Sequence, residues 1–271
     1  MEFTSILILF FFGLIGGFLS GLLGVGGGII FVPIVTFFLK QLGIDGEELV
    51  KYVLANSFGT IFFAGVISTY KQKKFSSFYP KQIFLTASLA MITSFVVSYL
   101  ITNQNWYSKR AFGILFLSLL VLTLIRFVIM KKGESIEVKD TKSYKYLITG
   151  FFTGIITALS GLGGGVVMIP LFTQYVKLNI KVAAAISIGS IPLIILPVLI
   201  NYGIALPVEY INELQVGYIL PHLIFPMVAG LVFAAPFGVA IAQKSSDKLL
   251  KIIFASLIVI VIFNTIGNLI K

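Results

Sequence analysis

The stretch Gly24-Val25-Gly26-Gly27-Gly28-Ile29-Ile30-Phe31-Val32-Pro33 decides how this chain folds. It returns in the second half as Gly161-Leu162-Gly163-Gly164-Gly165-Val166-Val167-Met168-Ile169-Pro170, and both copies read G-x-G-G-G-x-x-x-x-P. Three consecutive glycines weaken a helix by roughly 1 kcal/mol each relative to alanine. Both copies nevertheless lie inside apolar runs, at about 6–39 and 146–176. We therefore predict that each copy breaks a helix within apolar surroundings.

The composition indicates a membrane protein. Of the 271 residues, 58% are hydrophobic and 11% are charged, whereas a soluble domain carries about 25% charged residues. The net charge of +10 falls in short loops between apolar runs, which favours a role in membrane orientation over nucleic-acid binding. The chain has no cysteine, which excludes disulfides and thiolate metal sites. We predict an all-α polytopic membrane protein whose partner is the lipid bilayer.

The apolar runs predict where the helices lie, because a membrane span needs roughly 20 apolar residues. In the first half we expect helices at about 4–23, from the break at 24–28 to about 39, 51–70, 81–102 and 109–130. In the second half we expect the divided run 146–176, then spans at 182–202 (interrupted by Pro192 and Pro197), 216–242 and 251–270. The chain thus divides into a repeat at 1–130, a polar cytoplasmic linker at 131–145 and a repeat at 146–271.

Further matches between the halves support this division. Residues 55–60 resemble 185–190, 80–84 resemble 221–225, and 116–121 resemble 254–259, in the same order as the glycine motifs. Each half also opens with small residues at four-residue spacing, which favours close helix packing. These residues are Gly13, Gly17 and Gly21 in the first half and Gly150, Gly154 and Ala158 in the second.

The distribution of Lys and Arg distinguishes parallel repeats from inverted ones. If each broken run crosses the membrane once, the repeats are parallel and 11 of the 20 Lys and Arg residues lie inside. If each broken run goes in and returns, the repeats are inverted and 15 of the 20 lie inside. Cytoplasmic loops carry an excess of Lys and Arg. We therefore predict two inverted repeats, each a glycine-broken helical hairpin followed by three transmembrane helices, with both termini outside.

The glycine breaks are candidate anion sites. A helix that begins at glycine presents unpaired amides and a positive dipole end, without a side chain in the way. In the inverted arrangement the two helix starts approach from opposite sides and can hold one small anion near the midplane without a lysine. A tight turn or close packing is the alternative. The predicted substrate-binding residues are Gly26, Gly27, Gly28, Asn56, Ser57, Gly163, Gly164, Gly165, Ser187 and Ser190.

The remaining polar residues restrict the mechanism. No Asp or Glu lies deep in a predicted span, and no cluster of His, Asp and Glu indicates catalysis, a metal or a cofactor. His222, the only histidine, is expected near the outer end of its span, as an interfacial residue or a proton relay. This leaves a uniporter, a symporter that uses substrate protonation, or coupling through His222. A membrane scaffold or a membrane-embedded enzyme is the alternative class.

The paired G-x-G-G-G-x-x-x-x-P motifs, each followed by an A-x-S motif, resemble the sulfite exporter TauE/SafE family of membrane transporters. The resemblance covers essentially the whole chain. It implies a bacterial or archaeal inner-membrane carrier of sulfur-containing anions such as sulfite, thiosulfate, sulfonates or sulfoacetate. Within the second A-x-S motif, Ile186 stands where the first has Asn56. The oligomeric state does not follow from the sequence.

Overall fold

The computed structural model describes residues 3–75, 78–104, 106–129, 138, 141–208, 210–211 and 214–270. These residues form ten α-helices and one π-helical turn, and their only extended pairing is an isolated bridge between Val216 and Ile219. Within the described part of the chain, six helices are long and apolar enough to cross a membrane. The predicted all-α polytopic membrane fold is therefore confirmed.

The first half contains α1 (Phe3–Leu23), α2 (Gly28–Gln41), α3 (Gly46–Phe75), α4 (Pro80–Asn103) and α5 (Lys109–Ile129). The second half contains α6 (Ser143–Ser160), α7 (Gly165–Pro170), the π-helical turn η2 (Leu171–Tyr175), α8 (Ile180–Ile204), α9 (Pro221–Lys244) and α10 (Asp247–Ile270). Both helix breaks occur where the glycine motifs predicted them. Most of the predicted linker 131–145 lies outside the described residues, and the division into two repeats stays a prediction.

The span expected at 51–70 is longer than predicted, Gly46–Phe75, and two further predictions were wrong. The span expected from residue 216 begins at Pro221, because residues 216–219 form a tight turn. The interruption expected at Pro192 and Pro197 is absent, and α8 runs through both prolines. Pro192 has no N–H for the carbonyl of Ile188, but the Thr69 hydroxyl of α3 lies 3.1 Å from that carbonyl oxygen. The same hydroxyl lies 2.6 Å from the carbonyl oxygen of Gly65 in its own helix, so its one proton is shared between that carbonyl and the carbonyl that the proline leaves without a donor.

The packing of the second half repeats that of the first with the halves exchanged. Helix α1 packs along α9, and its counterpart α6 packs along α4. Likewise α3 contacts α9 while α8 contacts α4, and α3 and α8 pack on each other. These two central helices are the most buried of the six membrane-length helices. The helices are thus paired as the predicted internal repeat would require.

Small residues bring the paired helices close together. A methyl group on Gly13 would overlap the backbone carbonyl of Met227 in α9, and one on Gly150 would overlap the carbonyl of Thr86 in α4. The glycine faces of α1 and α6 are therefore packing faces, as their spacing predicted.

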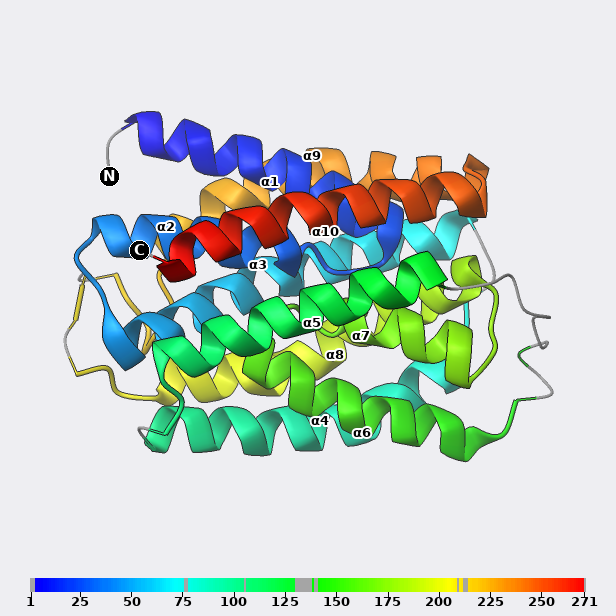
Figure 1. The fold of residues 1–271 in the computed structure, drawn as a ribbon, viewed down its shortest axis with the longest axis horizontal. Helices are drawn as coiled ribbons and strands as arrows, with labels where there is room; N and C mark the ends of the chain where they lie inside the picture. Colours follow the sequence, from blue (N-terminus) through cyan, green and yellow to red (C-terminus); the bar gives the residue numbers. More distant parts are fainter. Residues whose placement is uncertain are drawn as a thin grey trace.

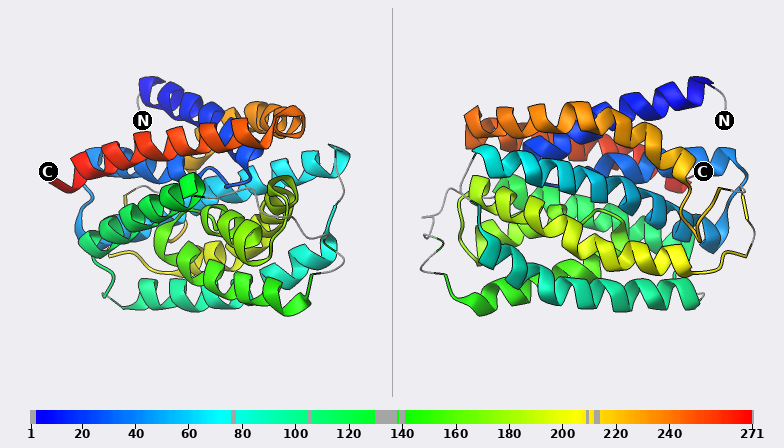
Figure 2. Two further views of the ribbon diagram at one scale, coloured as in Figure 1. Left: turned by 45° about the vertical axis from the view of Figure 1, so that its right-hand side comes forward. Right: turned by 180° about the vertical axis from the view of Figure 1, so that it is seen from behind.

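The chain direction reverses between the halves (Figures 1 and 2). Helices α1 and α2 run in from the end of the bundle that holds both termini and return to it. Helices α6 and α7 run in from the opposite end and return there. This is the chain course that inverted repeats require. Which end faces the cytoplasm stays a prediction.

Candidate functional site

The two glycine breaks share one backbone conformation. Left-handed residues occupy matching positions, which are Gly24, Gly26 and Gly27 in the first break and Gly161, Gly163 and Gly164 in the second. Their φ angles lie between 71° and 82°. An L-residue loses roughly 1–2 kcal/mol in this region. The backbone at both breaks therefore requires glycine independently of any ligand.

Each break leaves a row of buried amides without a backbone acceptor. The carbonyl of Gly27 accepts hydrogen bonds from the N–H groups of Ile30 and Phe31, and these bonds start α2. Within the described residues, no backbone carbonyl accepts from the amides of 26–29 or 163–166. Buried amides without partners cost several kcal/mol in apolar surroundings. Each row is therefore suited to an external acceptor.

The breaks meet in the interior of the protein. A methyl group on Gly28 would lie 2.7 Å from Cα of Leu162, and one on Gly165 would lie 2.6 Å from the carbonyl oxygen of Gly24. The hydroxyl of Ser187 in α8 donates a hydrogen bond to the same Gly24 oxygen at 2.8 Å. The second half of the chain thus holds the break of the first half in place.

Two isoleucines cover the breaks. A methyl group on Gly26 would lie 2.9 Å from Cγ2 of Ile61 and 3.1 Å from Cδ1 of Ile191, and one on Gly163 would lie 2.6 Å from Cγ2 of Ile61. Both isoleucines are fully buried. They occupy matching positions on α3 and α8. These two side chains therefore fill the space beside Gly26 and Gly163.

Asn56 and Ser190, like Ser187, bond to the chain itself. The side chain of Asn56 donates to the carbonyl of Tyr218 at 3.0 Å and accepts from the amide of Leu220 at 2.7 Å. The hydroxyl of Ser190 donates to the carbonyl of Ile186 at 2.8 Å. In this structure Asn56 fastens the 216–220 turn to α3, and Ser190 bonds within its own helix.

Ser57, Thr153 and Thr157 are among the residues of the described chain whose buried hydroxyls have no hydrogen-bond partner. A methyl group on Gly164 would lie 2.8 Å from Oγ1 of Thr157 and 2.8 Å from Cγ2 of Thr153. These two threonines therefore flank the second break. They were not among the predicted ligands, although with Thr149 they form a polar stripe at four-residue spacing on α6.

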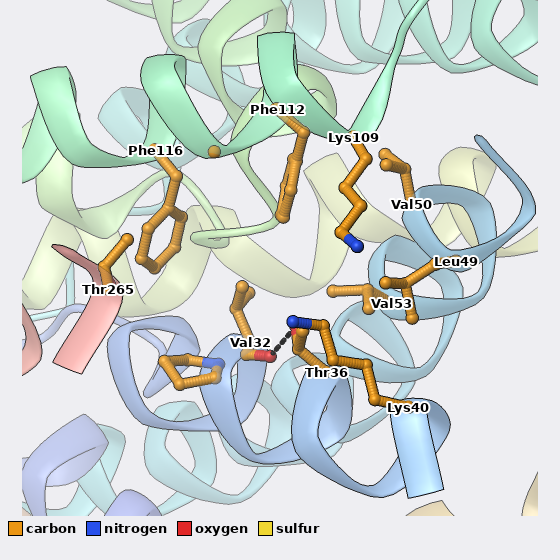
Figure 3. A pocket seen from close by; sticks show the side chains of 12 residues that line it. Val32, Thr36, Lys40, Leu49, Val50, Val53, Lys109, Phe112, Phe116 and Thr265 are labelled. Atoms are coloured by element: carbon orange, nitrogen blue, oxygen red, sulfur yellow. Dashed lines mark hydrogen bonds between the residues drawn. The ribbon is translucent and has the colours of Figure 1, made fainter. Parts of the chain in front are cut away.

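A cavity of about 80 Å³ lies elsewhere, at the end of the bundle that holds the termini. Residues of α2, α3, α5 and α10 enclose it (Figure 3). Lys40 and Lys109 turn their amines toward its space. Lys109 forms an ion pair with Asp45 at 2.5 Å. None of the predicted ligands lines this cavity, which we call the Lys40 cavity.

A polar network that the sequence did not predict lies near the same end. Lys51 is only 6% exposed, and its amine lies 3.0 Å from Glu48. The Tyr218 hydroxyl is 3.1 Å from Glu48, and Gln215 donates to the Tyr52 hydroxyl at 2.6 Å. These bonds fasten the turn before α9 to the start of α3.

His222 lies at the second position of α9 and is half-buried. Its Nδ1 has no hydrogen-bond partner in the described part of the chain. The described residues contain no group of three or more His, Asp or Glu side chains that could hold a metal ion.

The fold has helices of membrane-spanning length around two broken helices that meet inside the bundle. This arrangement is typical of multi-pass membrane transporters. The chain matches the family described as sulfite exporter TauE/SafE over residues 9–265. It belongs to this family, and the predicted resemblance is confirmed. The protein is therefore a multi-pass protein of the cell membrane that works on a small substrate.

Three relatives are each described as a probable membrane transporter protein. The relative from Methanocaldococcus jannaschii is 30% identical over 264 residues, covering 95% of both chains. The relative from Haemophilus influenzae is 25% identical, covering 97% of this chain and 98% of its own. The relative from Bacillus subtilis is 23% identical, covering 95% of this chain and 96% of its own. No solved structure shows significant similarity to the chain.

Proposed function

We propose that this protein carries a small sulfur-containing anion of the sulfite, thiosulfate, sulfonate or sulfoacetate class across the membrane. The anion would bind to the backbone amides of the two glycine breaks. One observation carries this proposal: both breaks present buried amides without backbone acceptors at the place where the halves meet. The description of the family as sulfite exporters supports the choice of anion.

The chemistry of the breaks suits an oxyanion. Each break offers several amides without a backbone acceptor, and a helix start adds a partial positive charge. The partnerless hydroxyl of Thr157 lies beside Gly164 and supplies a further donor without a change in the fold. Thr153 presents its methyl group there, so its hydroxyl would have to rotate toward the anion, and in our proposal the partnerless hydroxyl of Ser57 donates as well. Hydrogen bonds to an ionised acceptor are roughly twice as strong as neutral ones. A site of this kind holds an anion without a buried lysine.

Transport requires the covered breaks to open. In our proposal Ile61 and Ile191 withdraw in turn as the two halves rock against each other, which exposes the amides to one side at a time. Of the predicted side-chain ligands, Ser57 needs no rearrangement. Asn56, Ser187 and Ser190 would contribute only after exchanging their present bonds for bonds to the anion.

Isosteric threonine substitutions test the site without straining a glycine. Thr153→Val and Thr157→Val should each weaken sulfite binding by about 1.5–3 kcal/mol, the usual contribution of a hydrogen bond to a charged group. Thr149→Val is the matched control, because Thr149 is on the same buried face but donates to the carbonyl of Lys145 at 2.8 Å. The measurement is calorimetry on detergent-purified protein. Unchanged affinity in the first two variants, or an equal loss in the control, contradicts the proposal.

Transport itself separates a carrier from a scaffold or an enzyme. Purified protein in liposomes should accumulate labelled sulfite or one of the organic sulfonates, and Thr157→Val should slow that uptake. Binding without uptake of any of these anions would favour a scaffold. Chemical conversion of the anion would favour an enzyme.

A further inference from the structure

The Lys40 cavity combines apolar walls with a basic mouth. Its walls include Val32, Val50, Val53, Phe112 and Phe116, all buried. Its polar lining consists of Thr36, Lys40, Lys109 and Thr265. The Thr36 hydroxyl donates to the carbonyl of Val32 at 2.7 Å, so this hydroxyl is already engaged. The cavity therefore offers a ligand an apolar wall and the ammonium groups of the lysines.

The charges at the mouth do not cancel. Asp45 pairs with Lys109, and the hydrogen bond from Lys109 holds the pKa of the Asp45 carboxyl below its ordinary value, helped by the nearby charge of Lys40. Among the described residues, no carboxylate lies within ion-pair distance of Lys40. One positive charge is therefore left over, and Figure 3 shows that it faces the cavity.

The volume limits what fits inside. A dry cavity of about 150 Å³ in another protein takes up benzene, and this cavity measures about 80 Å³. It therefore holds a hydrocarbon arm of about two or three carbons, with the charged group left at the mouth. A bare inorganic oxyanion would leave the apolar walls unused.

The floor of the cavity reaches the second glycine break. Val32 lines the cavity, and its Cγ2 would lie 3.0 Å from a methyl group on Gly161. Cδ2 of Leu54 would also lie 3.0 Å from this methyl group. Val32 thus connects the cavity lining to Gly161, the first residue of the second break.

We propose that the Lys40 cavity is a second binding site, which takes a small organic anion with its charged head at Lys40 and a two- or three-carbon arm between Val53 and Phe112. A sulfonate or a carboxylate head satisfies Lys40 equally. This inference rests on the proposed function in one respect: the anion bound in the cavity is the transported anion, before it reaches the glycine breaks. The cavity selects for an organic anion before the amides bind its head.

The chain contains no cysteine. The reaction rate of a single cysteine introduced into the cavity therefore depends on the cavity alone. Thr36→Cys should react about tenfold faster with the anionic reagent sulfonatoethyl methanethiosulfonate than with its cationic trimethylammonioethyl counterpart, since a basic cleft concentrates anions. Ethanesulfonate should slow this reaction several-fold more than equal sulfate. Thr265→Cys, in the same cavity, is the second reporter if Thr36→Cys does not fold.

Two lysines provide the matched comparison. Adding Lys40→Gln should abolish the preference for the anionic reagent. Adding Lys248→Gln should not, because Lys248 is exposed in the first turn of α10, and α10 begins at the end of the bundle opposite the cavity (Figure 1). Equal rates for the two reagents in the parent, or equal protection by sulfate and ethanesulfonate, would overturn the inference.

Two further experiments distinguish anion binding in the Lys40 cavity from lipid binding and from anion binding at the glycine breaks. Protection in phosphatidylglycerol nanodiscs but not in phosphatidylcholine, with no effect of ethanesulfonate, would show a lipid site and overturn the inference. Protection should persist in Thr36→Cys combined with Thr157→Val. If sulfite binding and transport fail while ethanesulfonate still protects Thr36→Cys, the proposed function is wrong and the cavity site stands.

Discussion

Two serines at matching positions of the repeats have different partners. Ser187 donates to the carbonyl of Gly24 at 2.8 Å, whereas Ser57 is equally buried and its hydroxyl has no partner among the described residues. The residue before each serine also differs. Asn56, before Ser57, bonds to the 216–220 turn, whereas Ile186, before Ser187, has no polar side-chain atom with which to form such bonds. The two breaks are therefore alike in backbone but not in their side-chain surroundings.

This difference predicts opposite effects of one substitution. Ser187→Ala removes an existing bond to a buried carbonyl and should lower stability by about 0.5–1.5 kcal/mol. Ser57→Ala removes a hydroxyl that bonds to nothing and should leave the ligand-free protein as stable or slightly more stable, while weakening sulfite binding. The measurements are thermal unfolding in detergent and calorimetry. Equal losses of stability in both variants would show that Ser57 has a partner in solution.

At the scale of single residues, the sequence predicts the backbone better than the side chains. Runs of glycine directly predict left-handed residues, because few other residues tolerate them. The bond that a buried hydroxyl makes depends on which helix packs beside it, and no local pattern records that. The A-x-S motif therefore could not distinguish Ser57 from Ser187. The Lys40 cavity was missed for the same reason, because its residues come from four helices.

At the scale of helices, close contacts fix the pairs α1–α9 and α6–α4. The small faces of α1 and α6 were predictable because their glycines recur on one side of a helix. The partner helices were not, because spacing identifies a face and not its neighbour. The continuity of α8 through Pro192 was unpredictable in the same way, since the donor comes from Thr69 of another helix.

These contacts predict that Gly13→Ala and Gly150→Ala reduce the stability of the fold without changing affinity. The added methyl groups would meet backbone carbonyls of Met227 and Thr86, which cannot rotate away. Overpacking of this kind typically costs about 1–3 kcal/mol. The yield of monodisperse protein and its unfolding temperature should fall, while sulfite affinity in the folded fraction should match the parent.

The control for this test is Gly203→Ala in α8. A methyl group there would make only an ordinary contact, 3.5 Å from Cδ1 of Ile219, and alanine is the better helix former. This variant should be as stable as the parent. Loss of sulfite affinity in folded Gly13→Ala protein would instead place the α1–α9 contact in the binding mechanism.

At the scale of the whole molecule, charge and chain course agree. The segments that hold 15 of the 20 Lys and Arg residues are 71–81, 126–145, 177–181 and 244–251. The helix ends that they join lie at the end of the bundle opposite both termini (Figure 1). Positive charge gathers on the cytoplasmic side of membrane proteins. We therefore expect the end with the termini to face outward.

Single cysteines in the cysteine-free chain test this orientation. Gln104 follows α4 at the end that holds the termini, Ser143 begins α6 at the opposite end, and both are exposed. In intact cells, an impermeant thiol reagent should label Gln104→Cys and should label Ser143→Cys only after the membrane is opened. Both variants should keep sulfite uptake, which shows that the labelled protein is folded.

The two labels together also distinguish inverted from parallel repeats. Inverted repeats place residue 104 and both termini on one side and residue 143 on the other. A parallel arrangement, in which each broken run crosses once, puts the N-terminus on the side of residue 143, because α1 and α2 then add a crossing. Thr4→Cys, at the start of α1, distinguishes these two positions of the N-terminus. Labelling of Thr4→Cys together with Gln104→Cys supports the inverted repeat, whereas labelling of Gln104→Cys alone would require α1 and α2 to span the membrane as one unit.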